Sequence, residues 1–98
     1  MTYRFSRKAA EDLENLYVFG VKAFGLAQSE RYYAGLTTTL AFLAEYPLVA
    51  LARPELGPET RAYPYRSHVI FYRRDNQDIF VQRIRHGRED WKSPAAPA

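Results

Sequence analysis

The sequence predicts an α+β domain, in which an N-terminal strand and two antiparallel helices precede a three-stranded antiparallel meander. Apolar residues recur at helical spacing in the first half of the chain and follow strand-like patterns in the second half. Prolines and a glycine separate the two halves between residues 47 and 60. The order strand, helix, helix, strand, strand, strand therefore predicts a single, mostly antiparallel sheet packed against a helix hairpin.

The first strand and the first helix are expected to follow one another directly. Residues 2–5 alternate polar and aromatic side chains, and Ser6 is a suitable N-cap residue. Apolar side chains within residues 13–24 share one helical face, and Gly25 is a natural helix end. Three acids lie in the early turns, where the helix dipole favours negative charge: Glu11, Asp12 and Glu14.

The second helix is expected between Gly25 and Pro47, because the residue before a proline is disfavoured in the helical region. The short break at Gly25 predicts an antiparallel hairpin. Residues 47–60 contain three prolines and one glycine and are expected to form a loop. The apolar side of the second helix is made by these residues: Tyr32, Tyr33, Leu36, Leu40 and Leu43.

The last third of the chain is expected to form the meander, with a turn at residues 75–77 before its last strand. In that strand Ile79 and Val81 are expected on one face, and Phe80 and Ile84 on the other. A central strand covered on both faces has this pattern. The three expected strands are residues 61–65, 67–73 and 79–86.

The composition limits the classes of function. We expect one domain over residues 1–90 and a flexible tail over 91–98, whose Ser-Pro-Ala-Ala-Pro-Ala sequence has nothing to bury. A chain of 98 residues is too small for a large small-molecule cavity. Two histidines and no cysteine argue against a four-ligand structural zinc site. The sequence contains no glycine-rich phosphate loop, so we expect no cofactor. The sequence shows neither a secretion signal nor a membrane span, which fits a cytoplasmic protein.

Arginine is concentrated near the C-terminus. Residues 61–88 hold seven arginines and two acids, a local charge of 7 − 2 = +5, whereas residues 1–46 hold five bases and five acids. Arginine suits planar, bidentate recognition of phosphate or carboxylate. We therefore predict a basic face that binds an anionic target, with a merely solvated face as the alternative. Its residues are Arg61, Arg66, Arg73, Arg74, Arg83, Arg85 and Arg88.

Two histidines offer an enzymatic alternative. His68 and His86 lie on neighbouring expected strands, as do Arg61 and Arg83. Together they could cleave RNA, one imidazole taking the 2′-hydroxyl proton and the other protonating the leaving oxygen, while the arginines stabilise the phosphorane. The other interpretation is that both imidazoles make structural hydrogen bonds, because no carboxylate or lysine completes a known arrangement.

Aromatic and apolar residues suggest two further surfaces. Tyrosines 63, 65 and 72 interleave with the arginines, as in surfaces where nucleic-acid bases stack, although tyrosine is also an ordinary strand residue. Direct binding of nucleic acid thus stays open. Val18, Phe19 and Phe42 lie outside the main helical faces, so they either widen the core or form a groove for a partner helix.

The chain resembles the small bacterial toxins of the RelE/ParE superfamily, and most closely the ParE branch. The resemblance extends from Tyr3 to Asp90. It rests on the order and spacing of short motifs: Tyr3-Arg4-Phe5-Ser6, Ala9-Ala10-Glu11-Asp12-Leu13, Phe24-Gly25 before Gln28, Leu43-Ala44-Glu45-Tyr46-Pro47, Glu55-Leu56, Arg61, Ser67-His68-Val69-Ile70-Phe71-Tyr72, and Arg83-Ile84 with His86.

The resemblance implies a type II toxin that a ParD-like antitoxin neutralises and that inhibits DNA gyrase by binding rather than by catalysis. RelE relatives instead cleave messenger RNA on the ribosome, which is the second hypothesis. Where RelE-like nucleases tend to carry a basic residue opening the Ser67–Tyr72 strand, this chain has His68. The third hypothesis is a binding module that has lost toxicity.

Overall fold

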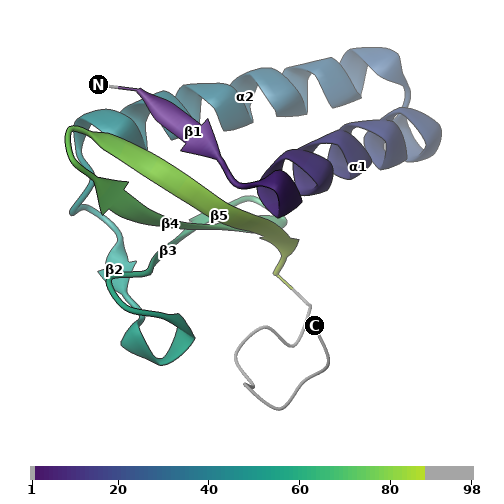
Figure 1. Cartoon of the computed structure of the whole chain (residues 1–98). Helices are drawn as coiled ribbons and strands as arrows, with labels where there is room; N and C mark the ends of the chain where they lie inside the picture. Colours follow the sequence, from purple (N-terminus) through teal and green to yellow (C-terminus); the bar gives the residue numbers. More distant parts are fainter. Residues whose placement is uncertain (1, 88–98) are drawn as a thin grey trace.

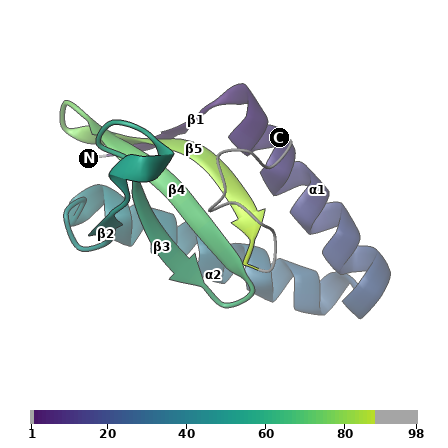
Figure 2. The ribbon, with the colours of Figure 1, turned by 90° about the horizontal axis from the view of Figure 1, so that it is seen from below.

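The computed structural model describes residues 2–87 and confirms the α+β class (Figure 1). Within these residues five strands form one sheet in the order β1-β5-β4-β3-β2, and both helices lie on the same side of it (Figures 1 and 2). The elements are β1 (Tyr3–Phe5), α1 (Arg7–Phe24), α2 (Leu26–Glu45), β2 (Leu51–Ala52), the 3-10 helix η1 (Pro54–Leu56), β3 (Arg61–Tyr65), β4 (His68–Asp75) and β5 (Asp78–His86).

The predicted helix boundaries are confirmed. The Ser6 hydroxyl accepts a hydrogen bond from the Ala9 amide (2.9 Å) and so caps α1, as its N-cap position predicts. Gly25, with φ of +92°, separates α1 from α2. No helix within residues 2–87 is both long and apolar enough to cross a membrane. The expected tail over 91–98, and the domain end at residue 90, lie outside the described residues.

The core lies between the two helices and the sheet, with α1 contributing Ala9. Leu36, Leu40 and Leu43 of α2 are fully buried against residues of β4 and β5. Among them is Tyr72, whose hydroxyl donates a hydrogen bond to the Pro47 carbonyl (2.8 Å). Burial raises the pKa of the Tyr72 hydroxyl, so this donor keeps its proton at neutral pH. The hydrogen bond fixes the end of α2 to the centre of the sheet.

A β-bulge changes the face on which Ile84 lies. Tyr72 pairs with Val81, but the preceding residue Phe71 pairs with Arg83, so Gln82 is an extra residue in β5. Ile84 therefore faces the core together with Val81. The expectation that Ile84 shares a face with Phe80 was wrong, because an inserted residue reverses the alternation beyond it.

The expected loop over residues 47–60 contains two short elements. Leu51–Ala52 forms β2, which pairs antiparallel with β3, and Pro54–Leu56 forms η1. The turn between β4 and β5 is also tighter than predicted, with Asn76 (φ +60°) and Gln77 alone between the strands. Asn tolerates this left-handed conformation better than most residues.

Helix α1 covers the edge of β5 that β1 is too short to reach. β1 pairs in parallel with residues 79–81 of β5. Beyond them, the Ser6 hydroxyl donates to the Gln82 carbonyl (2.8 Å), and the Asp12 carboxylate accepts from the Ile84 amide (3.0 Å). Backbone groups that a longer β1 would have paired are thus satisfied by α1.

Candidate functional site

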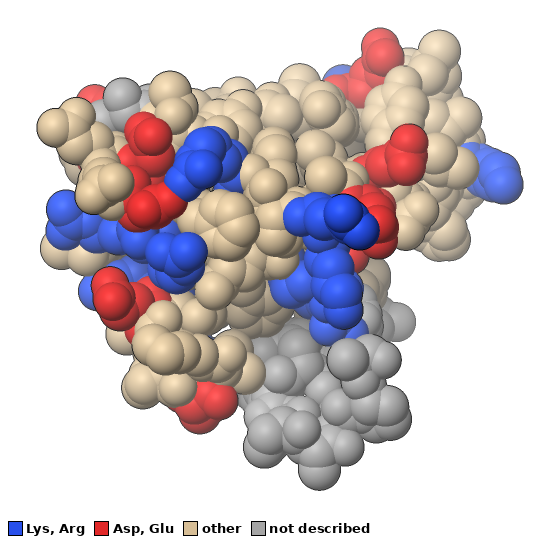
Figure 3. All heavy atoms as spheres, in the orientation of Figure 1, with Lys and Arg blue, Asp and Glu red and all other residues tan. Residues whose placement is uncertain are grey.

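Four arginines lie on the side of the sheet away from the helices. On β4, Ile70 and Tyr72 face the core, so Arg73 faces the opposite side. The strand register places Arg83, Arg85 and, from β1, Arg4 on that side as well. We call these four residues the arginine face. Figure 3 shows Lys and Arg side chains in two groups over the sheet, with acidic side chains beside each group.

The other arginines of the predicted basic face lie elsewhere. Arg61 is on the helix side of β3 and donates to the Ala50 carbonyl (2.7 Å). Arg66 occupies the β3–β4 turn with φ of +51°, and its guanidinium lies 5.7 Å from the centre of the Tyr65 ring. Arg74 borders a groove beside the β4–β5 turn. Arg88 lies outside the described residues. The structure thus divides the predicted basic face.

Each half of the arginine face combines arginine with an aromatic ring and a carboxylate. Phe80 lies between Arg73, 4.9 Å from the ring centre, and Arg4, 5.8 Å from it. Arg4 also forms an ion pair with Asp75. Such stacking holds guanidinium groups in place by cation–π attraction.

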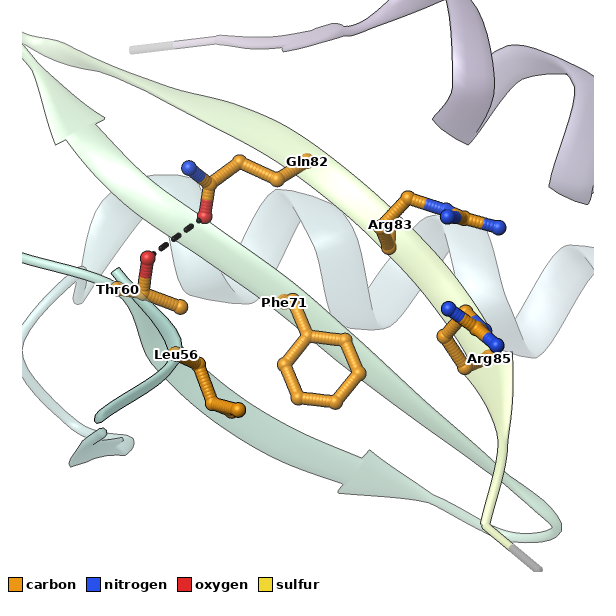
Figure 4. Close-up of a pocket in the computed structure, with 6 residues that line it drawn as sticks. All are labelled: Leu56, Thr60, Phe71, Gln82, Arg83 and Arg85. Atoms are coloured by element: carbon orange, nitrogen blue, oxygen red, sulfur yellow. Dashed lines mark hydrogen bonds between the residues drawn. The ribbon is translucent and has the colours of Figure 1, made fainter. Parts of the chain in front are cut away.

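Near the other end of β5, Arg83 and Arg85 border a pocket of about 240 Å³ (Figure 4). Phe71 and Leu56 give it an apolar side, and the Thr60 hydroxyl donates to the side-chain oxygen of Gln82 (3.0 Å). Arg83 donates two hydrogen bonds to Asp12, of 2.8 and 3.0 Å. This half of the face is therefore positioned by α1 and by the bulge.

The tyrosines do not line the arginine face. Tyr72 is fully buried, and Tyr63 and Tyr65 pack against the core from the helix side. Phe80 and Phe71 are the rings that accompany the four residues of the arginine face. The register of β3 and β4 turns the three tyrosines toward the helices, as ordinary strand tyrosines that pack on the core, and the Tyr65 ring lies beside an arginine of the predicted basic face, Arg66.

The structure joins the two histidines but separates them from both arginines. His68 and His86 are cross-strand partners with ring centres 5.3 Å apart. They lie on the helix side of the sheet, opposite to Arg83. Arg61 pairs with Tyr72, four residues along β4 from His68, a separation of about 13 Å. The four residues of the nuclease hypothesis therefore do not form one site.

Tyr32 of α2 holds His68. Its hydroxyl lies 2.7 Å from Nδ1 of His68, accepts from the Ser67 amide (3.3 Å) and lies 3.4 Å from the Tyr65 carbonyl, to which it can donate. Burial raises the pKa of the Tyr32 hydroxyl, which keeps it protonated near neutral pH.

The predicted apolar surface also falls into two parts. Phe42 is 39 % exposed and borders an apolar groove of about 750 Å³ with Tyr46, Leu48 and Val49. Phe19 and Val18 are exposed on α1. Val18 precedes Gly25 by seven residues and Phe42 follows it by seventeen, so the two are about 15 Å apart along the hairpin.

Two residues of these surfaces are missing from the sequence-based prediction. The charge count places Arg4 in the balanced N-terminal half, and its alternation with Tyr3 and Phe5 is the signal that puts it on the opposite face. The sequence predicts for Asp12 only a favourable position at the start of a helix, whereas in the structure its carboxylate accepts hydrogen bonds from Arg83 and from the Ile84 amide. No local pattern indicates that long-range contact.

Comparisons with known proteins agree on one family. A family model described as "ParE toxin of type II toxin-antitoxin system, parDE" matches residues 3–91. Toxin ParE1 of Caulobacter vibrioides is 32 % identical over 71 residues, which cover 72 % of this chain and 74 % of that protein. A structure described as "Chromosomal ParDE TA system from P. aeruginosa" has the same fold, with a TM-score of 0.74 and 22 % identity over 88 % of this chain and 95 % of that one.

Proposed function

Because the chain belongs to the ParE toxin family of type II toxin–antitoxin systems, we propose that it stops bacterial growth by binding DNA gyrase and that a ParD-like antitoxin neutralises it. Gyrase acts on DNA in the cytoplasm, so the toxin would act there too. The structural observation that supports this proposal is the arginine face, which presents cations from three strands of a rigid sheet.

The same geometry favours inhibition by binding over cleavage of RNA. A general acid and base must reach the same phosphate as the groups that stabilise its charge. Here the imidazoles lie on the helix side of β5, and Arg83 and Arg85 lie on the other side. The RelE-like nuclease hypothesis would have to work with the histidine pair and without these arginines.

Expression of the chain without antitoxin should stop growth and induce a DNA-damage response while translation continues. Purified toxin should inhibit supercoiling by gyrase. The His86→Ala variant should remain toxic, because a binding inhibitor does not use His86 as an acid or base, whereas a nuclease would lose roughly 10²–10⁴-fold in rate. Colony counts, a DNA-damage reporter and a supercoiling assay measure these effects.

Sequencing RNA from arrested cells tests for the result that would contradict gyrase inhibition. If translated messages contained breaks phased with codons, and if His86→Ala abolished these breaks, the hypothesis of ribosome-dependent cleavage would replace that of gyrase inhibition. Normal growth with abundant folded protein would instead support a binding module that has lost toxicity.

We further propose that the antitoxin binds the apolar groove beside Phe42 and extends toward Val18 and Phe19. About five extended residues span the 15 Å between the two parts. Phe42→Glu should weaken antitoxin binding by about 1–3 kcal/mol, the range for a central aromatic anchor. The thermal midpoint should change little, because Phe42 is 39 % exposed. Calorimetric titration with the cognate antitoxin measures the affinity.

Leu26→Glu is the matched control for that substitution. Leu26 is 58 % exposed at the start of α2, beyond the groove. If Leu26→Glu weakened binding as much as Phe42→Glu, the groove would have no special role. If Phe42→Glu unfolded the protein, Phe42 would belong to the core.

A further inference from the structure

The histidine pair at the end of the sheet has the geometry of a metal-binding site. His68 and His86 are direct cross-strand partners. The Gly87 amide donates to the Ser67 carbonyl (2.8 Å) immediately beyond them, so His68 and His86 form a non-hydrogen-bonded pair, the kind in which side chains lie closest. Both imidazoles border a cavity of about 240 Å³ between the helix hairpin and the sheet.

The distance between the rings matches shared coordination. With Zn–N bonds of about 2.0–2.1 Å and tetrahedral geometry, two imidazoles on one zinc ion have ring centres roughly 5 Å apart. The observed separation is 5.3 Å, and the ring planes are inclined by 70°. The observed ring separation is therefore close to that of two imidazoles on one ion.

Tyr32 supplies the outer contact that a metal-binding imidazole requires. Its hydroxyl can donate to the Tyr65 carbonyl (3.4 Å) while accepting from Nδ1–H of His68 (2.7 Å). That arrangement leaves the lone pair of His68 on Nε2, which is the atom that would bind a metal. A hydrogen bond of this kind orients the ring and raises its basicity.

We propose that His68 and His86 bind one divalent transition metal ion, with Zn²⁺ as the representative, and that Tyr32 positions His68 for it. Imidazole nitrogen suits Zn²⁺, Cu²⁺ and Ni²⁺ rather than Mg²⁺. Among the described residues no group of three or more His, Cys, Asp or Glu side chains gathers to hold an ion, so within residues 2–87 the two imidazoles are the proposed protein ligands, and water can fill remaining positions. The cavity beside the rings has room for it. This two-ligand surface site differs from the four-ligand structural site that the composition argues against, and it is independent of gyrase inhibition.

Titration of the untagged, full-length protein with Zn²⁺ tests the site. We expect saturable binding of one ion per chain and a rise in the unfolding temperature, because the ion links β4 to β5 only in the folded state. His86→Ala should weaken binding roughly a hundredfold, and Tyr32→Phe by about 10–100-fold, although it keeps both imidazoles. Electron paramagnetic resonance with Cu²⁺ should show two coordinated nitrogens in the wild type and one in His86→Ala.

Gln28→Ala is the matched control, since Gln28 borders the same cavity but carries no imidazole. It should bind Zn²⁺ as the wild type does, and Mg²⁺ should bind to none of the proteins. Equal Zn²⁺ affinity in the wild type and in folded His86→Ala would overturn the proposal, as would the absence of saturable binding. Unchanged affinity in Tyr32→Phe would overturn the role given to Tyr32.

Discussion

Replacement of both Arg73 and Arg85 by glutamate should abolish growth arrest without unfolding the toxin. The two residues come from different halves of the arginine face, so their reversal removes cations from both. Close charge pairs in protein interfaces contribute about 1.5–7 kcal/mol. Loss of two such contacts should raise the concentration for half-inhibition of gyrase at least roughly a hundredfold, since about 1.4 kcal/mol corresponds to a factor of ten.

Arg83 is left unchanged in this experiment because its reversal would also disturb α1 through Asp12. The control is Lys22→Glu with Arg31→Glu, which changes the net charge equally but on the exposed surface of the helix hairpin. A similar loss of toxicity in the control would mean that bulk charge matters and the arginine face does not. Full gyrase inhibition by the Arg73, Arg85 variant would refute the proposed target surface.

Asp12→Ala should cause the largest loss of stability from a single side chain outside the apolar core. The carboxylate accepts from the Arg83 guanidinium and from the Ile84 amide, and its side chain is only 15 % exposed. Its removal leaves two donors without this acceptor and opens the edge of β5. We expect the free energy of unfolding to fall by about 2–3 kcal/mol. This value is below that for a fully buried ion pair, because the Arg83 side chain is 30 % exposed. For a domain of this size the melting temperature should fall by roughly 10–20 °C.

Urea denaturation followed by circular dichroism measures this loss. Asp12→Asn should recover part of it, because the amide oxygen can still accept from Ile84 while the charge is absent. Glu11→Ala, at an exposed position one residue earlier, should change stability by less than about 0.5 kcal/mol. Equal stability of the Asp12→Ala and Glu11→Ala variants would show that α1 does not depend on this contact.

The helices could be predicted closely because local residues determine where they end. Ser6, Gly25 and Pro47 act within a turn of their own position, and the structure places the helix boundaries beside them. β2 could not be predicted, since two residues are too few to show alternation. The face of Ile84 could not be predicted either, because the bulge at Gln82 depends on pairing with β4.

The candidate surfaces show the same division between local and long-range information. Charge counting located arginine in the C-terminal half, and the pairing of His68 with His86 follows from the predicted meander. Which arginines share a face depends on strand register, which separated Arg61 and Arg74 from Arg73 and added Arg4. A count of charges along the chain does not show how the strands pair, so it cannot assign each arginine to a face of the sheet.

The parallel pairing of β1 with β5 has a consequence for the timing of synthesis. Tyr3 pairs with Ile79, 76 residues later in the chain, so the first strand made must wait for the last. At about 5–20 residues per second, translation needs roughly 4–15 s to cover that interval. During this interval β1 has no strand to pair with, and α1 has no β5 edge to cover. The nascent toxin therefore cannot complete its sheet on the ribosome until β5 has emerged, so a toxin with all five strands paired exists only near the end of synthesis.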